Sequence, residues 1–285
     1  MLDALPIESD PDTTAFYRHV LQALDGAGVP FLVGGAYAFA GYTGIQRNTK
    51  DLDLFIRRED LARAAQALRE AGYPAELTFP HWLAKVHCGA AFVDLIFNSG
   101  NGVSPVDDEW FAHAPRNQVL GVSVLMSPAE EALWSKAFIM ERERYDGADV
   151  AHLIRSHGAH FDWQRLLRRF GPHWRVLLSH LVLFGFIYPG QREVVPQWLL
   201  DQLMARLHSE SRRPAPDTEL CAGTLLSREQ YLHDVERSGL TDARVTPLST
   251  MTPADVDDWT RAIPGRQLPP DAVPLPAPQF SPRVS

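Results

Sequence analysis

The sequence predicts an α/β fold: a small mixed sheet flanked by helices, then a helical bundle and a proline-rich C-terminal tail. Short apolar strands alternate with amphipathic helices in the N-terminal half, and the pattern then turns helical throughout. The last 22 residues hold seven of the 22 prolines, which favours an extended or disordered tail. We therefore expect four parts, namely a strand-rich domain at 1–126, a helical domain at 127–210, a small α/β appendage at 211–263 and the tail at 264–285.

Composition excludes several classes of protein. Of 285 residues, 45% are hydrophobic and 22% charged, as in folded globular proteins. The most apolar segment, 176–188, is too short to cross a bilayer and contains His180, so we expect no membrane partner. The N-terminus lacks a signal-peptide pattern, and two cysteines cannot form a disulfide scaffold, so we expect a cytoplasmic protein. A net charge of −8 argues against a general nucleic-acid coat.

The elements of the strand-rich domain follow from apolar spacing and from glycines. Helical spacing predicts a helix over 13–27, and a buried strand over 29–33 leads into Gly34 and Gly35. A strand pattern over 82–88 and another over 91–97 are joined by a short link, which indicates an antiparallel hairpin. The remaining expected elements are a short helix over 36–41, a strand over 51–56, a helix over 59–71 and a strand over 119–125.

The C-terminal half begins with a helix-start pattern at 127–130, which has a cap, a proline and an acid in the first turn. From there to about residue 209 we expect four or five packed helices, broken at glycines and prolines. A linker is expected over 211–218. Residues 219–245 suggest a strand, a helix over 227–238 and a strand near Val245.

Two aspartates point to the chemistry of the chain. Asp51 and Asp53 stand two apart on one strand, so both carboxylates project from the same face and repel each other. A divalent cation such as Mg²⁺ relieves that repulsion. Asp94 lies inside an apolar strand, where a charge is costly unless it is paired or metal-bound. Three carboxylates on adjacent strands can hold two metal ions for phosphoryl or nucleotidyl transfer.

The glycines before this strand fit the same chemistry. Gly34 and Gly35 would let the backbone approach a phosphate at the start of the next helix, although a plain turn needs them too. Arg47 and Lys50 lie just before the aspartates and could neutralise a triphosphate, or could simply keep a loop soluble.

Residues 31–56 resemble the polymerase-β-like nucleotidyltransferase superfamily, whose pattern is Gly-Gly or Gly-Ser after a strand, then Asp-x-Asp, then a distant third acid. The form Arg47-x-Thr49-x-Asp51-x-Asp53-Leu54 is similar to the branch that holds AbiEii-type toxins, MenT-like relatives and many uncharacterised bacterial nucleotidyltransferases. The lincosamide and aminoglycoside nucleotidyltransferases are more distant relatives. The resemblance covers about residues 13–158.

The resemblance implies a role for each matching residue. Gly34 and Gly35 would contact nucleotide phosphates, and Asp51, Asp53 and Asp94 would bind two Mg²⁺ ions, with Mn²⁺ as a substitute. Asp94 could also help deprotonate an acceptor hydroxyl. Lys136 would face the triphosphate, and Asp146 or Asp149 would orient it or contact the acceptor. The alternatives are a solvated lysine and two helix-capping acids.

The expected function is Mg²⁺-dependent transfer of a nucleoside monophosphate from an NTP such as ATP to an acceptor hydroxyl. The acceptor stays open between an RNA end such as that of tRNA, a protein and a small molecule, and a toxin-type enzyme with a separate antitoxin is one form of this function. The arginine-rich segment 165–175 could bind RNA, or could form a solvated face. The alternative is a catalytically silent nucleotide-binding or protein-interaction module, against which the intact acid triad argues.

Overall fold

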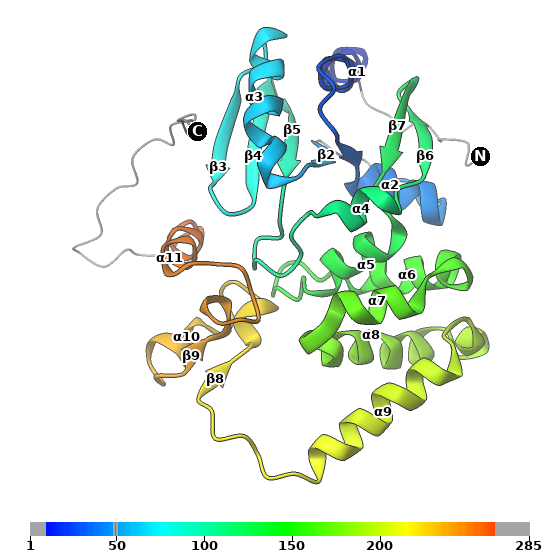
Figure 1. Ribbon diagram of the computed structural model, residues 1–285, viewed down its shortest axis with the longest axis vertical. Helices are drawn as coiled ribbons and strands as arrows, with labels where there is room; N and C mark the ends of the chain where they lie inside the picture. Colours follow the sequence, from blue (N-terminus) through cyan, green and yellow to red (C-terminus); the bar gives the residue numbers. More distant parts are fainter. Residues whose placement is uncertain (1–9, 48, 50, 266–285) are drawn as a thin grey trace. The chain divides into compact units, whose positions relative to one another are not determined.

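The computed structural model describes residues 10–47, 49 and 51–265, which form two compact units (Figure 1). The first unit joins the chain up to Pro128 to the segment from Met251 onward, and the second spans Ala129–Thr250. The proline-rich tail predicted for 264–285 lies outside the described residues from residue 266 onward. The four-part division expected from the sequence stays a prediction.

A seven-stranded mixed sheet is the centre of the first unit, in the order β3-β4-β5-β2-β1-β7-β6. β2 runs parallel to β5, β1 runs parallel to β7, and the other neighbours are antiparallel. The strands are β1 (Leu32–Val33), β2 (Asp51–Phe55), β3 (Ala75–Phe79), β4 (Leu83–Cys88), β5 (Ala91–Ile96), β6 (Arg116–Val119) and β7 (Val122–Met126). The predicted mixed α/β fold is confirmed.

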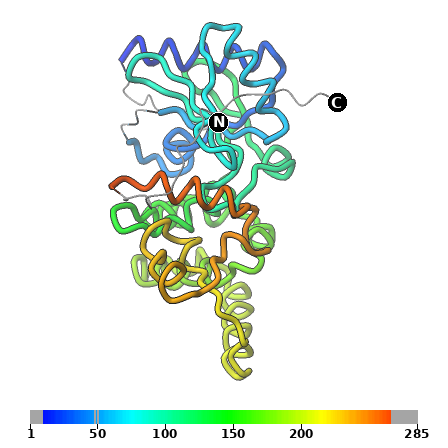
Figure 2. The backbone as a smooth tube through the Cα atoms, turned by 90° about the vertical axis from the view of Figure 1, so that its left-hand side faces the viewer, coloured from blue at the N-terminus to red at the C-terminus, as the bar shows by residue number. Residues whose placement is uncertain are grey.

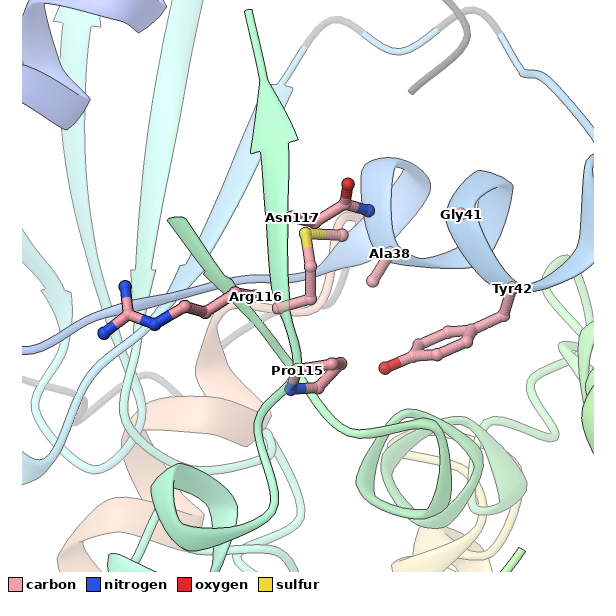
Figure 3. A pocket seen from close by; sticks show the side chains of 7 residues that line it. Ala38, Gly41, Tyr42, Pro115, Arg116 and Asn117 are labelled. Carbon is pink, nitrogen blue, oxygen red and sulfur yellow. The ribbon is translucent and has the colours of Figure 1, made fainter. Parts of the chain in front are cut away.

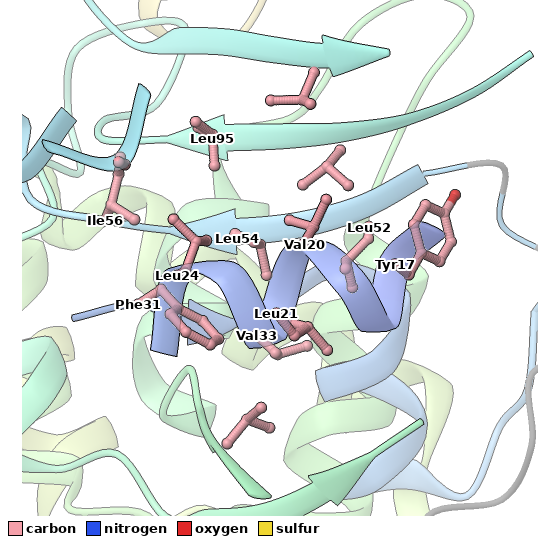
Figure 4. Packing of buried hydrophobic residues seen from close by; sticks show 14 of the residues in the cluster. Tyr17, Val20, Leu21, Leu24, Phe31, Val33, Leu52, Leu54, Ile56 and Leu95 are labelled. Atoms are coloured by element: carbon pink, nitrogen blue, oxygen red, sulfur yellow. The ribbon is translucent and has the colours of Figure 1, made fainter. Parts of the chain in front are cut away.

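Helices cover one face of this sheet. α1 and α3 pack on each other and on the apolar side chains of the central strands. Val20 and Leu24 of α1 lie against Leu52 and Leu54 of β2, and all four are fully buried (Figure 4). The helices of this unit are α1 (Pro11–Gly26), α2 (Gly35–Thr43), α3 (Leu61–Glu70), α4 (Asp108–Ala112) and α11 (Pro253–Arg261). The side chains on the other face of β2 are not buried against these helices.

The last described helix, α11, returns to the sheet although it comes last along the chain (Figure 2). Its Trp259 ring lies edge-on to Phe79, with 4.7 Å between centroids, and to Trp82, at 5.3 Å. Gly100 leaves room for this indole, because a Cβ there would come within 2.8 Å of it. These contacts pack α11 against β3, an edge strand of the sheet.

Several boundaries differ from the sequence-based expectation. The strand expected over 119–125 is broken by a tight turn, since Leu120 and Gly121 both adopt positive φ, and it becomes the end of β6 and the start of β7. The helix expected over 227–238 shortens to α10 (Leu232–Glu236). The residues before it form a turn, in which the Ser227 hydroxyl accepts hydrogen bonds from the main-chain N–H groups of Glu229 and Gln230. The strand expected near Val245 is instead β9 (Thr241–Asp242), followed by a short 3₁₀ turn.

The second unit is mainly helical, as predicted. Its helices are α5 (Ala129–Ala137), α6 (Gly147–His157), α7 (Trp163–Phe170), α8 (Trp174–Ile187), α9 (Gln197–Ser211) and α10, and its two short strands are β8 (Leu220–Cys221) and β9. The region expected to be a linker, 211–218, holds no strand or helix beyond the end of α9. Within the described ranges, every helix falls short of the length and apolarity that a membrane crossing requires.

Buried ion pairs connect α5 to α7. The Arg165 guanidinium, 2% exposed, donates to Glu131 and lies 2.8 Å from Glu130 Oε2. Arg169 Nε donates to Glu131 Oε1 at 3.0 Å. Burial raises the pKa of Glu131, and the two arginines oppose that rise. For these two arginines, neither the RNA-binding nor the solvated-face interpretation holds, because both guanidinium groups neutralise acids inside the unit.

We predict that Arg165→Met destabilises the chain by about 3–5 kcal/mol, because it leaves the Glu131 carboxylate buried without its main partner. Arg168→Met is the matched control, since Arg168 is exposed on the same helix, and should change stability by less than about 0.5 kcal/mol. Urea unfolding of both variants checks this. Equal unfolding midpoints would contradict the structural importance of the ion pair.

Candidate active site

Three aspartates of the first unit come together on the side of the sheet that α1 and α3 leave uncovered. Carboxylate oxygens of Asp51, Asp53 and Asp94 all lie within 4.8 Å of one another. Asp51 and Asp53 come from β2, and Asp94 comes from β5, directly opposite Asp53 in the parallel pairing. The sequence predicted this grouping from the two-residue period of the strand and from the position of Asp94.

The alternation of burial in β2 explains why the acids face outward. Leu52 and Leu54 are fully buried against the helices, while Asp51 and Asp53 are partly exposed. Slipping the strand by one residue would bury both carboxylates and expose both leucines. Thr49 supports the first acid, since its hydroxyl donates to the Asp51 carboxylate.

Asp94 is the most buried member of the triad, at 9% exposed. Burial raises the pKa of its carboxyl, and the nearby Asp51 charge adds to the rise, while the Lys85 ammonium opposes it. Lys85 lies on β4 directly opposite Asp94, and its Nζ donates to Asp94 Oδ1 at 2.6 Å.

Lys85 was not among the residues predicted for the site, although the sequence held a signal for it. The expected hairpin has a two-residue turn at Gly89 and Ala90, so Cys88 pairs with Ala91. Three residues back from Cys88 and three residues forward from Ala91, the register places Lys85 opposite Asp94. The register of the hairpin, rather than a motif, was therefore the signal that could have found this residue.

Gly34 and Gly35 connect β1 to α2 directly beside the triad. Gly34 N–H donates to the main-chain oxygen of Asp53 at 2.9 Å, which ties the turn to β2. Gly35 has φ of +52°, and a Cβ there would lie 1.7 Å from Asp53 Oδ2. A Cβ at Gly34 would lie 2.1 Å from the Phe55 ring. Both glycines are therefore needed sterically, because any side chain would displace a residue of β2.

Of the two basic residues predicted before the aspartates, only Arg47 lies among the described residues. Arg47 places its guanidinium carbon 4.6 Å from the centre of the Phe39 ring of α2. This cation–π contact holds the positive charge of Arg47 beside α2. Lys50 lies outside the described residues.

The other predicted site residues lie together inside the second unit. Lys136 of α5 donates from Nζ to Asp146 Oδ2 at 3.0 Å and to Asp149 Oδ2 at 2.7 Å. Burial would raise the pKa of Asp146, but hydrogen bonds and charge from Arg144 and Lys136 outweigh it and lower that pKa. Lys136 is thus not a solvated surface lysine, and its charge is held by two largely buried acids at the start of α6.

A small pocket lies between α2 and the start of β6 in the first unit (Figure 3). It is lined by Ala38, Gly41, Tyr42, Pro115, Arg116, Asn117 and Met126. The Tyr42 hydroxyl beside it donates to the main-chain oxygen of Ser127 at 2.9 Å. None of the residues predicted for the site lines this pocket.

Comparison with known families identifies the chain. Residues 13–174, more than half of its length, match the family described as uncharacterised nucleotidyltransferase. The chain belongs to this family. It is therefore an enzyme of the nucleotidyltransferase class, and the predicted membership in the polymerase-β-like superfamily is confirmed. The narrower assignment to the AbiEii-type branch stays a prediction. Comparison with curated proteins gave no match.

Solved structures show a weaker similarity to this nucleotidyltransferase. The antibiotic-resistance factor ANT(2'')-Ia shares 16% identity, covering 60% of this chain and 98% of its own, with a TM-score of 0.43. The lincosamide antibiotic adenylyltransferase LnuA shares 15%, covering 51% and 98%, with a TM-score of 0.36. A nucleotidyltransferase-like protein from Paracoccidioides brasiliensis shares 16%, covering 60% and 92%, with a TM-score of 0.35. Scores this low carry no information about substrate.

The acid triad of the nucleotidyltransferase fits a divalent metal. Its donors are three carboxylates, the hard oxygen ligands that Mg²⁺ and Mn²⁺ prefer. The oxygens are close enough for one ion to contact all three carboxylates. The raised pKa of Asp94 records the cost of holding these charges together in a buried place, and a cation would offset that cost.

We predict that Gly35→Ala weakens Mn²⁺ binding by the purified chain at least about tenfold, because the added methyl displaces the Asp53 carboxylate. Gly44→Ala is a matched control: Gly44 also has positive φ, at +70°, but nothing lies within 4 Å of its Cβ position. It carries the same kind of backbone strain without touching the triad. Calorimetric titration with Mn²⁺ checks both variants, and equal losses would show that strain alone is responsible.

Proposed function

We propose that this nucleotidyltransferase transfers a nucleoside monophosphate from an NTP to an acceptor hydroxyl and releases pyrophosphate, in a reaction that depends on divalent cations bound by Asp51, Asp53 and Asp94. The observation that carries the proposal is the convergence of three carboxylate oxygens within 4.8 Å beside a glycine turn. When bound there, Mg²⁺ would neutralise phosphate charge and polarise the α-phosphate.

In this reaction the acceptor oxygen forms a bond to the α-phosphorus, and the bond from that phosphorus to the bridging oxygen breaks, so pyrophosphate leaves. The proton of the hydroxyl goes to Asp94. Its position supports this role, because Asp94 stands directly opposite Asp53 and its carboxylate lies within 4.8 Å of the other two acids.

We assign the remaining residues to binding. The N–H groups at the start of α2, which Gly34 and Gly35 open to close approach, would hold phosphate oxygens. Lys136 would supply a positive charge to the triphosphate, with Asp146 and Asp149 orienting its ammonium through the hydrogen bonds described above. Arg47 and Lys50 would add charge from the segment before β2.

Two observations favour a small or cationic acceptor over a long RNA. The net charge of −8 repels a polyanion. Arg165 and Arg169, which could have formed an RNA-binding face, are occupied by Glu130 and Glu131. A toxin-type activity on an RNA end remains a distinct outcome of the assay below.

The test is a transfer assay with Mg²⁺ and each α-labelled NTP, using total RNA, protein extract or a pool of small hydroxylated molecules as acceptor. We expect label in one acceptor class, and a loss of roughly a hundredfold or more in Asp51→Asn and Asp53→Asn. Asp25→Asn, an exposed acid on α1, is the control and should keep full activity. Lys136→Met should raise KM for the NTP.

The proposal fails if the aspartate variants transfer label as fast as the unchanged chain. It also fails if EDTA leaves the rate unchanged, since a reaction that needs bound divalent cations cannot survive their removal.

A further inference from the structure

Lys85 contacts the acid triad through Asp94, although no sequence motif predicted this contact. It stands opposite Asp94 on β4, and Asp94 stands opposite Asp53 on β2, so the three side chains form one row across three strands. The Lys85 cation stands at one end of this row, and the two anions follow it. The Lys85 side chain is 24% exposed and that of Asp94 is 12% exposed, so water screens this ion pair less than it screens a surface pair.

A second contact fixes the Lys85 ammonium. Its Nζ lies 4.1 Å from the centre of the Phe92 ring, which precedes Asp94 by two residues and projects from the same face of β5. Phe92 is paired with Asp51 across the parallel strands. The ammonium is therefore held between the Phe92 ring and the Asp94 carboxylate, which both lie on β5, the strand next to β2.

The charge of the site follows from this placement. Three carboxylates with one ammonium carry a formal charge of −2 instead of −3. The ammonium also occupies Oδ1 of Asp94, so a metal ion at Asp94 must either bind Oδ2 beside this positive charge or displace the ammonium. The Lys85 ammonium and a divalent cation therefore compete for the Asp94 carboxylate. Asp51 and Asp53 lie one strand further from the ammonium.

We propose that Lys85 is a positioning residue that limits the nucleotide-free triad to one divalent cation, with its ammonium standing at Asp94 in place of a second ion. The second ion enters only with the triphosphate, whose negative charge compensates for the added cation. Lys85 thereby couples full metal loading to the presence of the NTP. This inference rests on the proposed metal site but does not depend on which acceptor is used.

The test counts bound Mn²⁺ by calorimetry and by electron paramagnetic resonance, without any acceptor. The unchanged chain should bind one Mn²⁺ alone, and two in the presence of a non-hydrolysable α,β-methylene nucleotide. Lys85→Met, which keeps the length of the side chain and removes its charge, should bind a second Mn²⁺ without nucleotide, at least about tenfold more tightly than the unchanged chain does. Lys85→Arg keeps the charge and should behave like the unchanged chain.

Two results would overturn the inference. The first is that the unchanged chain binds two Mn²⁺ ions without nucleotide. This measurement does not depend on whether any variant folds. The other is a Lys85→Met protein that binds Mn²⁺ with the same number and affinity as the unchanged chain, or more weakly, since Lys85 would then only support the strands. Adding Asp94→Asn to Lys85→Met should abolish the second ion, and retention of that ion would place it elsewhere.

Failure of this inference and failure of the proposed function give different results. If the metal counts do not depend on Lys85 but label transfer still requires Asp51, only the inference is wrong. If the metal counts follow the expectation while no NTP is ever consumed, the role of Lys85 stands and the transfer reaction is wrong.

Discussion

The pairing of β2 with β5 is the constraint on which the candidate site depends. Parallel register sets Asp53 opposite Asp94, and the same register sets Leu52 opposite Val93 and Leu54 opposite Leu95 on the other face. Burial of the apolar residues against α1 and α3 therefore forces the carboxylates together. The hydrophobic core stabilises the fold, and part of that free energy offsets the repulsion between the acids of the site.

Charge balance in the interior follows one rule throughout the described residues. Three groups of buried acids are each accompanied by a cation from a neighbouring element, which is Lys85 for Asp94, Lys136 for Asp146 and Asp149, and Arg165 for Glu130 and Glu131. A further buried acid, Asp242, pairs with Arg244 two residues later. Such pairs contribute little net stability compared with apolar packing, yet loss of one partner is costly. The two pairs formed by lysines involve residues that we assign to catalysis or binding, and the arginine group connects helices.

The sequence was most informative where a side-chain period and a core face coincide. Asp51, Asp53 and Asp94 could be grouped because strand alternation decides which way each residue points. Lys136 could be chosen as a site candidate, but its contacts with Asp146 and Asp149 depend on how α5 packs on α6, which local pattern does not encode. The strand at 75–79 was missed because its residues are only partly buried and show no clean alternation. The arginines of α7 were misjudged because a charged residue gives no sign in sequence that an acid 34 residues away will pair with it.

We propose that the three carboxylates form one site, which binds metal and transfers the nucleotide. A crystal structure with Mn²⁺ and an α,β-methylene nucleotide, with data collected at the manganese absorption edge, tests it most directly. We expect anomalous peaks in contact with Asp51, Asp53 and Asp94, with the triphosphate beside Gly34 and Gly35. Manganese bound elsewhere, with the triad holding no ion in the presence of the nucleotide, would contradict it.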